Sequence, residues 1–220
     1  MSLVVLKVGG AVAGEASAAL AQLEGHDVVV VHGAGPQITD ELERRGLTVS
    51  FVNGRRVTDF ATMRVVRAIL LAVNAHVCTA IGEHAVGLSG DEIGLQAVRV
   101  ARLGLVGDPV PSRPRAILEA LARGLVPVVA PLAEGPLNVN ADEAAGALAA
   151  GLAADRILFA TDVPGVLRDG AVVSRIAADD AETGIADGEF EGGIVPKLEA
   201  AIHAARLGVQ AEIGATAVVA

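Results

Sequence analysis

The sequence predicts an α/β fold, a three-layer sandwich in which helices cover both faces of a mainly parallel sheet. Short apolar runs rich in valine, such as residues 3–8 and 27–32, are typical of strands buried on both faces. Each run is followed by a glycine turn and then by a stretch with a helical pattern. Alternating strands and helices indicate parallel strands joined by right-handed crossovers. No linker or repeat divides the sequence, so we expect a single domain over residues 1–220.

The first half of the chain is predicted to alternate strands and helices. The alanine-rich stretch 11–23 and the periodic stretch 37–45 indicate helices, the second ending at Gly46. Asn53-Gly54 is a strong hairpin dipeptide, so residues 49–58 are expected to form two short paired strands. The remaining predictions are a long helix from Asp59 to about Ile81, strands at 85–88 and 126–130, two edge strands within 96–106, a proline-rich loop at 107–114 and a helix at 117–123.

The second half continues the same alternation. Asn140 or Asp142 can cap an alanine-rich helix over residues 143–154. Pro196, at a first helical position, begins a helix over residues 197–207. The remaining predictions are a strand at 156–160, an edge strand at 171–176 in a hairpin turned at Asp169-Gly170, an acidic loop with a short helix at 179–193 and a last strand at 209–213.

Composition and charge exclude several classes of protein. A net charge of −9 argues against a general surface for nucleic acid or anionic membrane. The single cysteine, Cys78, excludes an internal disulfide and fits a reducing compartment. The most membrane-like run, residues 68–82, is too short to span a bilayer, and no targeting segment is visible. We therefore expect a cytoplasmic protein that binds neither nucleic acid nor membranes.

The two lysines stand out among 17 basic residues, because all the others are arginines. Lys7 ends a predicted strand before Gly9-Gly10, and Lys197 follows Gly192-Gly193. A lysine is a compact point charge that reaches a phosphate oxygen without the planar fork of arginine. Lys7 could also simply extend from a strand end into solvent, and that possibility stays open for the motif alone.

Several groups of polar or small residues follow predicted strands, and ligands of open α/β sheets bind beyond the carboxyl ends of the strands. Glycine turns, amides, a carboxylate and a lysine are what a nucleotide-phosphate site requires. P-loop and dinucleotide motifs are absent, and the histidines and the cysteine lack metal-ligand spacing, so no protein-held metal is expected. The groups expected to share one sheet edge are Lys7 with Gly9 and Gly10, Gly33 with Ala34 and Gly35, Ser89 with Gly90, Asn138 with Asn140 and Asp142, and Thr161 with Asp162.

These and neighbouring motifs resemble the amino acid kinase family over roughly residues 3–210. Their order and spacing are most similar to the branch of that family that phosphorylates N-acetyl-L-glutamate in arginine biosynthesis. The motifs are Lys-Val-Gly-Gly at 7–10, His-Gly-Ala-Gly-Pro at 32–36, Asn-Gly-Arg-Arg-Val-Thr at 53–58, Asn-Val-Asn-Ala-Asp at 138–142, Thr-Asp-Val-Pro-Gly-Val at 161–166 and Gly-Gly-Ile-Val-Pro-Lys at 192–197.

The resemblance implies transfer of a phosphoryl group from ATP, accompanied by Mg²⁺ held mainly by its phosphates, to the side-chain carboxylate of N-acetyl-L-glutamate. It implies a lobe to about residue 131 for substrate binding and dimerisation and a nucleotide lobe from about 138 to 220. Lys7, Lys197 and Asp142 would be catalytic, with Asp142 orienting both lysines. The implied substrate ligands are Gly33, Ala34, Arg56, Asn138 and Asn140, and the implied nucleotide ligands are Gly9, Gly10, Thr161, Asp162, Gly165, Gly192 and Gly193.

Each of these residues also has a purely structural interpretation. Asp142 could only cap a helix, Asn138 and Asn140 could be turn residues, and Thr161-Asp162 could begin a loop. Arg56 could be a surface cation, and we expect its neighbour Arg55 to be one. The structural interpretations do not explain why so many such motifs follow strands in a chain with two lysines.

Two departures from the family pattern keep other functions open. Ala34 stands where relatives have glycine, and the chain is short after Ile213. The alternatives are a related kinase acting on another carboxylate or on carbamate, such as an aminoadipate derivative, or an inactive sensing or scaffold protein with the same fold.

The long helix beginning at Asp59 predicts a homodimer. Val65, Val66, Ile69, Leu70, Val73 and Val77 cover more than one helical face, so part of the helix is expected to stay unburied in one subunit. The resemblance points the same way. Because so few residues precede the first strand, we also expect no inhibition by arginine.

Overall fold

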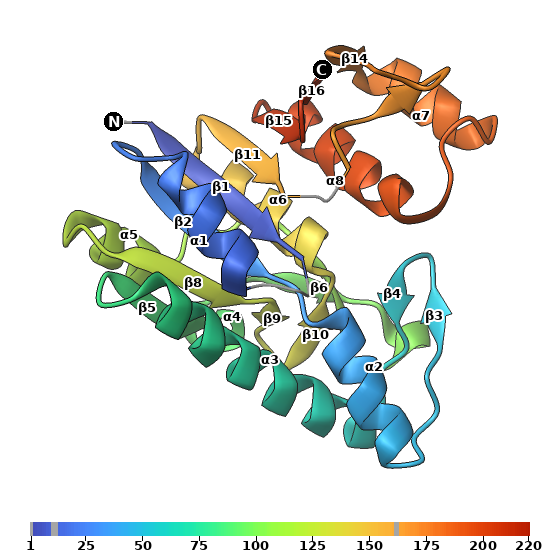
Figure 1. Cartoon of the computed structure of the whole chain (residues 1–220). Coiled ribbons are helices and arrows are strands. Elements are labelled where there is room, and N and C mark those ends of the chain that lie inside the picture. The colour runs from blue at the N-terminus through green and yellow to red at the C-terminus, as the bar shows by residue number, and fades with distance from the viewer. Residues whose placement is uncertain (1, 10–12, 161–162) are drawn as a thin grey trace.

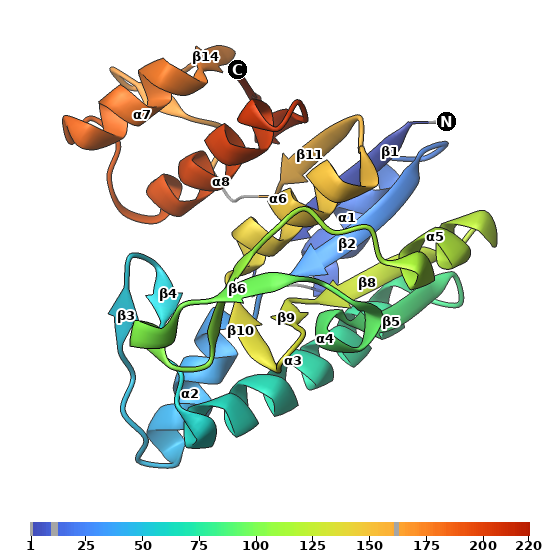
Figure 2. The ribbon, with the colours of Figure 1, turned by 180° about the vertical axis from the view of Figure 1, so that it is seen from behind.

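The structure, a computed structural model, describes residues 2–9, 13–160 and 163–220 and confirms the α/β fold. Helices cover both faces of a central eight-stranded sheet (Figures 1 and 2). All neighbouring strands of this sheet run parallel except β15 and β16. In spatial order the strands are β14 (Arg175–Ala177), β16 (Thr216–Val219), β15 (Gln210–Ile213), β11 (Arg156–Phe159), β1 (Leu3–Val8), β2 (Asp27–His32), β8 (Val126–Ala130) and β5 (Ala85–Ser89).

The helices divide between the two faces of the sheet. Helices α1 and α3 pack on one face, and α5, α6 and α8 pack on the other. Their bounds, with those of the shorter helices, are α1 (Ala13–Ala21), α2 (Gly35–Arg44), α3 (Phe60–Ile81), α4 (Gly90–Ile93), α5 (Arg115–Ala122), α6 (Ala141–Leu152), α7 (Ala178–Ala186) and α8 (Val195–Arg206), with 3₁₀ turns η1 (Ala101–Leu103) and η2 (Gly192–Ile194).

The alternation of side chains along the central strands decides which layer each polar residue meets. In β1, Val4 and Leu6 enter the core with α1, whereas Val5 enters the core with α6. Successive side chains of a strand point to opposite faces, so Lys7 lies on the face of Val5, toward α6. By the same rule His32, at the end of β2, lies on the face that α3 covers.

A second, four-stranded sheet was not predicted and corrects two expectations. Residues 107–114 were expected to be a loop, but their first part belongs to a strand. Asn138 was expected after a strand, yet it lies inside one and pairs with Val106. Such short segments become strands through tertiary pairing, which their sequence alone does not reveal. The sheet contains β6 (Ala97–Arg99), β7 (Val106–Pro109), β10 (Leu137–Val139) and β9 (Leu132–Ala133).

The predicted hairpin around Asn53-Gly54 is confirmed as β3 (Phe51–Val52) and β4 (Arg55–Arg56). Both turn residues have positive φ, 48° and 71°, which suits this dipeptide. The predicted beginning of α3 at Asp59 is also confirmed, and the Asp59 carboxylate caps the helix by accepting a hydrogen bond from the Thr62 N–H at 2.7 Å.

The C-terminal part differs from the prediction at two points. The stretch expected as one edge strand at 171–176 is divided between β13 (Ala171–Val172), which pairs with β12 (Leu167–Arg168), and β14. The strand at 210–213 is not the last, because β16 turns back antiparallel to it. The short runs of small residues in these segments carry too weak a pattern to set strand boundaries.

Helix α3 confirms the predicted long helix, but its exposure differs from the expectation. Its 22 residues exceed the apolar run 68–82, and its length and composition would suffice to cross a membrane. That test alone is weak evidence, since helices packed in protein cores pass it too, and 28% of its most apolar window is buried here. The apolar residues from which the dimer was predicted are buried or half-buried. Its exposed residues are mixed in character, namely Phe60, Ala61, Arg64, Ala68, Leu71, Ala72, Ala75, His76, Thr79 and Ala80.

Candidate active site

A cleft of about 320 Å³ opens at the carboxyl ends of β1 and β2. It is walled by the β3–β4 hairpin, the beginnings of α2 and α6, and strand β10. Many of the residues singled out from the sequence meet here. They are Lys7, Gly9, Gly33, Ala34, Arg56, Asn138, Asn140, Asp142 and Lys197.

Lys7 and Asp142 form a buried ion pair in the cleft. Lys7 Nζ lies 2.8 Å from Asp142 Oδ1, and the two residues are only 6% and 8% exposed. The pair forms because Lys7 faces α6 and Asp142 occupies the first turn of that helix. The helix cap is Asn140, whose Oδ1 accepts hydrogen bonds from the Asp142 and Glu143 N–H groups. The Asp142 carboxylate is therefore left to hold the lysine.

Arg56 is a buried cation without an acidic partner. It is 6% exposed, and within the described chain no carboxylate lies within ion-pair distance of it. Its Nη2 donates to Gly35 O at 3.1 Å and to Thr39 Oγ1 at 2.8 Å, and its guanidinium stacks 4.5 Å from the centre of the Phe51 ring. Nη1 is buried with no hydrogen-bond partner.

Burial alone lowers the pKa of Arg56, yet guanidinium groups stay charged in proteins. A buried positive charge with an unsatisfied donor is costly unless a ligand satisfies it. The arrangement therefore favours binding of an anion, and a carboxylate matches the planar fork of arginine.

Two helix N-termini add positive potential to the same cleft. Gly35 and Pro36 begin α2, and Ala141 begins α6, and all three line the cleft. Helix N-termini favour anions through the helix dipole, and α2 has no side-chain cap on its first N–H groups, whereas Asn140 caps those of α6. Lys197, from the first turn of α8, is half-buried on the opposite wall and donates weakly to Gly193 O at 3.4 Å.

Of the two amide residues, Asn138 lies in strand β10 rather than in a turn, and the prediction that Asn140 could cap the following helix is confirmed. Asn138 Nδ2 donates to Thr58 Oγ1 at 3.0 Å, and Thr58 Oγ1 donates to Arg56 O at 2.7 Å. Thr58, which is fully buried, thus connects β10 to the hairpin. Asn140, besides capping α6, donates to Gly54 O at 3.4 Å.

The glycine motif at residues 33–35 leaves fewer backbone N–H groups free to bind a ligand than its sequence suggests. Gly33 N–H already donates to Val8 O at 3.1 Å. Ala34 has a φ of −152°, which any residue adopts, and its methyl is buried in the core beneath α2. The extra methyl at this position therefore packs without backbone strain.

Other predicted site residues lie apart from the cleft lining or outside the described residues. Gly165 packs against β16, and Gly192 and Gly193 are exposed before α8. Ser89 and Gly90 sit at the far edge strand, where Asp91 pairs with Arg67. Because β5 runs parallel to β8, these residues share the carboxyl edge of the sheet as expected, but they do not line the cleft. Gly10, Thr161 and Asp162 lie outside the described residues.

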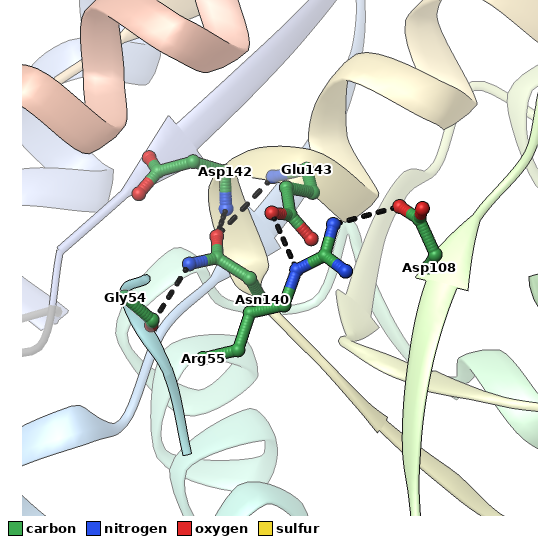
Figure 3. A network of polar contacts seen from close by, with 6 residues as sticks. All are labelled: Gly54, Arg55, Asp108, Asn140, Asp142 and Glu143. Carbon is green, nitrogen blue, oxygen red and sulfur yellow. Dashed lines mark hydrogen bonds and ion pairs between the residues drawn. The ribbon is translucent and has the colours of Figure 1, made fainter. Parts of the chain in front are cut away.

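Sequence reasoning missed several residues around the cleft. Arg55 was expected to be a surface cation, but it is half-buried and bound to two carboxylates, Asp108 and Glu143 (Figure 3). Strand alternation could have indicated this, because a neighbour of a cleft-facing Arg56 must face the other way.

His32 belongs to one of the family-like motifs but received no role from the sequence. It is fully buried, and its Nε2 lies 3.2 Å from Asn74 Nδ2 of α3, which also donates to Val128 O at 2.8 Å. Burial lowers the pKa of His32 to about 4, so the ring is neutral near pH 7. This network ties the turn at Gly33 to the long helix.

Comparison with known proteins shows to which family this chain belongs. A model of the amino acid kinase family matches residues 2–214. The chain belongs to that family. An acetylglutamate kinase of Gluconobacter oxydans is 39% identical over 242 aligned residues, which cover 96% of this chain and 82% of that protein.

Two further proteins are similar to this chain over most of its length. An acetylglutamate kinase of a Jannaschia species is 42% identical over 229 residues, covering 96% of this chain and 80% of that protein. The crystal structure of smu.665 from Streptococcus mutans superposes with a TM-score of 0.88 at 30% identity, covering 99% of this chain and 98% of that one. Among the described residues no group of three or more histidine, cysteine or acidic side chains is placed to hold a metal ion.

Proposed function

We propose that this kinase transfers the γ-phosphoryl group of ATP to the side-chain carboxylate of N-acetyl-L-glutamate, giving N-acetylglutamyl 5-phosphate in arginine biosynthesis. The observation that carries the proposal is Arg56, a buried cation with an unsatisfied Nη1 in a cleft that also holds a lysine and two helix N-termini. Relatives about 40% identical over most of the chain, all acetylglutamate kinases, support the choice of acceptor.

The chemistry needs positioning and charge stabilisation rather than a base. The acceptor carboxylate is already ionised at neutral pH. One of its oxygens forms a bond to the γ-phosphorus, the bond from that phosphorus to the bridging oxygen breaks, and ADP leaves with the electron pair. Lys7 and Lys197 stabilise the negative charge that spreads over the transferring group. Asp142 fixes Lys7 at 2.8 Å and so preorganises that contact.

The acceptor and the nucleotide occupy different parts of the proposed site. Arg56 binds the α-carboxylate, and Asn138, Asn140 and the turn at Gly33-Ala34 contact the rest of the amino acid. Gly9, Gly10, Thr161, Asp162, Gly165, Gly192 and Gly193 contact the nucleotide. The strand order supports this division, because strands from residues 3–130 form one half of the sheet and strands from 156–219 the other.

Mg²⁺ arrives with ATP in this proposal. Asp142 is the one carboxylate among the described residues lining the cleft, and Lys7 already engages it. Mg²⁺ that keeps phosphate and water ligands suits such a site better than one caged by protein. We further propose that the enzyme works in the cytoplasm as a homodimer, with the exposed side of α3 in the interface.

The decisive experiment measures ADP release with four acceptors: N-acetyl-L-glutamate, N-acetyl-aminoadipate, glutamate and carbamate. We expect the highest kcat/KM with N-acetyl-L-glutamate. Arg56→Gln should raise the KM for that acceptor about 10- to 100-fold, as expected for loss of a charged hydrogen bond. Arg123→Gln, an exposed arginine at the end of α5, is the control and should change nothing.

The alternatives predict different results in the same assay. A higher kcat/KM with another acceptor would assign the enzyme to that substrate. No turnover above background with any acceptor would favour an inactive relative that keeps the fold.

A further inference from the structure

The β3–β4 hairpin carries Arg56 but has little of its own to hold it in place. Each strand has two residues, and residues 51–54 are exposed. An isolated two-stranded hairpin is at best marginally stable. Backbone hydrogen bonds join its base at Thr58 to Leu103 and Leu105, so the position of the exposed residues over the cleft depends on side-chain contacts to the body of the protein.

Arg55 supplies two charged contacts of this kind, one to the part-buried Glu143 and one to Asp108, whose side chain is 57% exposed. Its Nε donates to Glu143 Oε1 at 2.9 Å and its Nη2 donates to Asp108 Oδ1 at 2.7 Å (Figure 3). Glu143 lies in the first turn of α6, and Asp108 lies in β7 of the second sheet. One guanidinium thus joins the hairpin to two separate elements. The Arg55 side chain is 21% exposed and that of Glu143 is 28% exposed, so solvent screens the contact only partly.

The position of this contact in the sequence is what relates it to the cleft. Arg55 directly precedes Arg56, and Glu143 directly follows Asp142. Adjacent residues of a strand face opposite sides, so β4 presents Arg56 to α2 while Arg55 reaches α6 and β7. Figure 3 shows the Asp142 carboxylate turned away from Arg55, which leaves it to Lys7. The link therefore sets the spacing between the two charged groups on either side of the cleft.

We propose that Arg55 is a positioning residue that fixes the β3–β4 hairpin to α6 and β7 and thereby holds Arg56 where it binds the acceptor carboxylate. The inference rests on the proposed function for the identity of the acceptor. It adds a residue that touches no reacting atom, and it assigns Glu143 and Asp108 as the anchors of that residue.

The test compares the wild type with Arg55→Gln, Arg55→Lys, Glu143→Gln and the double variant Arg55→Gln/Glu143→Gln. We expect Arg55→Gln to raise the KM for N-acetyl-L-glutamate about tenfold, with the KM for ATP and kcat within about twofold of wild type. Arg55→Lys keeps the charge and should recover part of the loss. The double variant should be no worse than Arg55→Gln, because both changes break the same contact.

The matched control is Arg206→Gln. Arg206 also binds two carboxylates of another element, Asp179 and Glu182 of α7, but it lies at the far end of α8. The variant Arg206→Gln should leave the KM values for N-acetyl-L-glutamate and for ATP unchanged. An unchanged acceptor KM in Arg55→Gln, or an equal rise in the control, overturns the proposal.

Amide hydrogen exchange separates this proposal from the proposed function. In Arg55→Gln without any ligand, exchange should speed up in residues 50–57 and stay at the wild-type rate in the central sheet. Unchanged exchange in the hairpin overturns the positioning role whatever the substrate is. If exchange in the hairpin is faster but calorimetry detects no binding of N-acetyl-L-glutamate, Arg55 does fix the hairpin. The proposed acceptor is then wrong.

Discussion

Lys7 and Lys197 are the residues at which charge and geometry can be separated by experiment. Each replacement by arginine keeps the positive charge but substitutes a planar fork for a point charge. Loss of one such donor to the transferring group is worth about 3–4 kcal/mol, so we expect kcat to fall by about 10²–10³ in each variant. Steady-state kinetics measures this, and thermal melting checks folding, above all for the buried Lys7.

The size of the loss decides whether these assignments hold. Activity within a factor of about three of wild type in both variants would contradict them. If Lys7→Arg loses activity and its melting temperature also collapses, the kinetic measurement is repeated with Lys7→Met. That variant lacks the charge but fits the space.

His32 makes folding stability depend on pH in a defined window. Its pKa is about 4 in the folded protein because it is buried, against 6.5 ordinarily. The unfolded chain therefore binds a proton that the folded protein does not, and stability falls as pH drops from 6.5 to 4. The free energy of unfolding falls by about 3 kcal/mol in total through this group, because a tenfold difference in proton affinity corresponds to about 1.4 kcal/mol.

Urea unfolding at pH 7.0 and pH 4.5 tests this in the wild type and in His32→Gln. We expect the wild type to lose about 2 kcal/mol more than the variant between these pH values. Carboxylates titrate in both proteins and cancel in the comparison. Equal losses in the two proteins would contradict a buried neutral His32.

At the scale of elements, α6 is fitted closely to the loop before α5. A Cβ added at Gly151 would lie 2.1 Å from Ser112 O and 2.3 Å from Ser112 N. Both contacts are with backbone, which cannot rotate away. Gly146 lies in the same helix, but its nearest neighbour would be Ala200 O at 3.8 Å. Substituting each of these two glycines in turn therefore distinguishes the effect of close packing on stability from the effect of helix propensity.

Alanine at these two glycines should have opposite effects. Gly151→Ala should lower the free energy of unfolding by at least about 2–3 kcal/mol through overpacking and lower the melting temperature by roughly 5–10 °C. Gly146→Ala should gain up to about 1 kcal/mol, because alanine is the better helix former. Calorimetry measures both, and a stabilising Gly151→Ala would show that α6 and the loop are not packed this closely.

At the scale of the whole molecule, we propose that a second copy packs against α3. The exposed side of this helix carries Ala61, Ala68, Leu71, Ala72 and Ala75 beside the polar Arg64, His76 and Thr79. Light scattering at micromolar concentration should give about twice the 22.1 kDa mass of one chain. Leu71→Glu should yield the monomer, because it places a charge in the interface.

Leu207→Glu is the control for that experiment. Leu207 is 43% exposed at the end of α8, close to the 38% of Leu71, but it lies on another element. It should leave the dimer intact. A monomeric wild type, or a dimer unaffected by Leu71→Glu, counts against assembly through α3.

Local sequence determined the elements whose formation needs few distant contacts. The valine runs of β1 and β2, the Asn53-Gly54 turn, the Asp59 cap and Pro196 at the beginning of α8 predicted their structures, because strand burial, turn geometry and helix capping act over a few residues. The order of these elements also predicted the α/β class, since buried parallel strands require helical crossovers.

Tertiary structure decided how distant residues meet. The strands β7, β9 and β10 are too short to carry a pattern, and they form because they pair with one another. The ion pair of Lys7 with Asp142 follows from strand alternation and the placement of α6, which no spacing within the sequence contains. Arg55 was expected to be a surface cation, whereas its partners Asp108 and Glu143 lie 53 and 88 residues away in the sequence. Electrostatic contacts over such separations are set by the packing of whole elements, and only the folded chain reveals them.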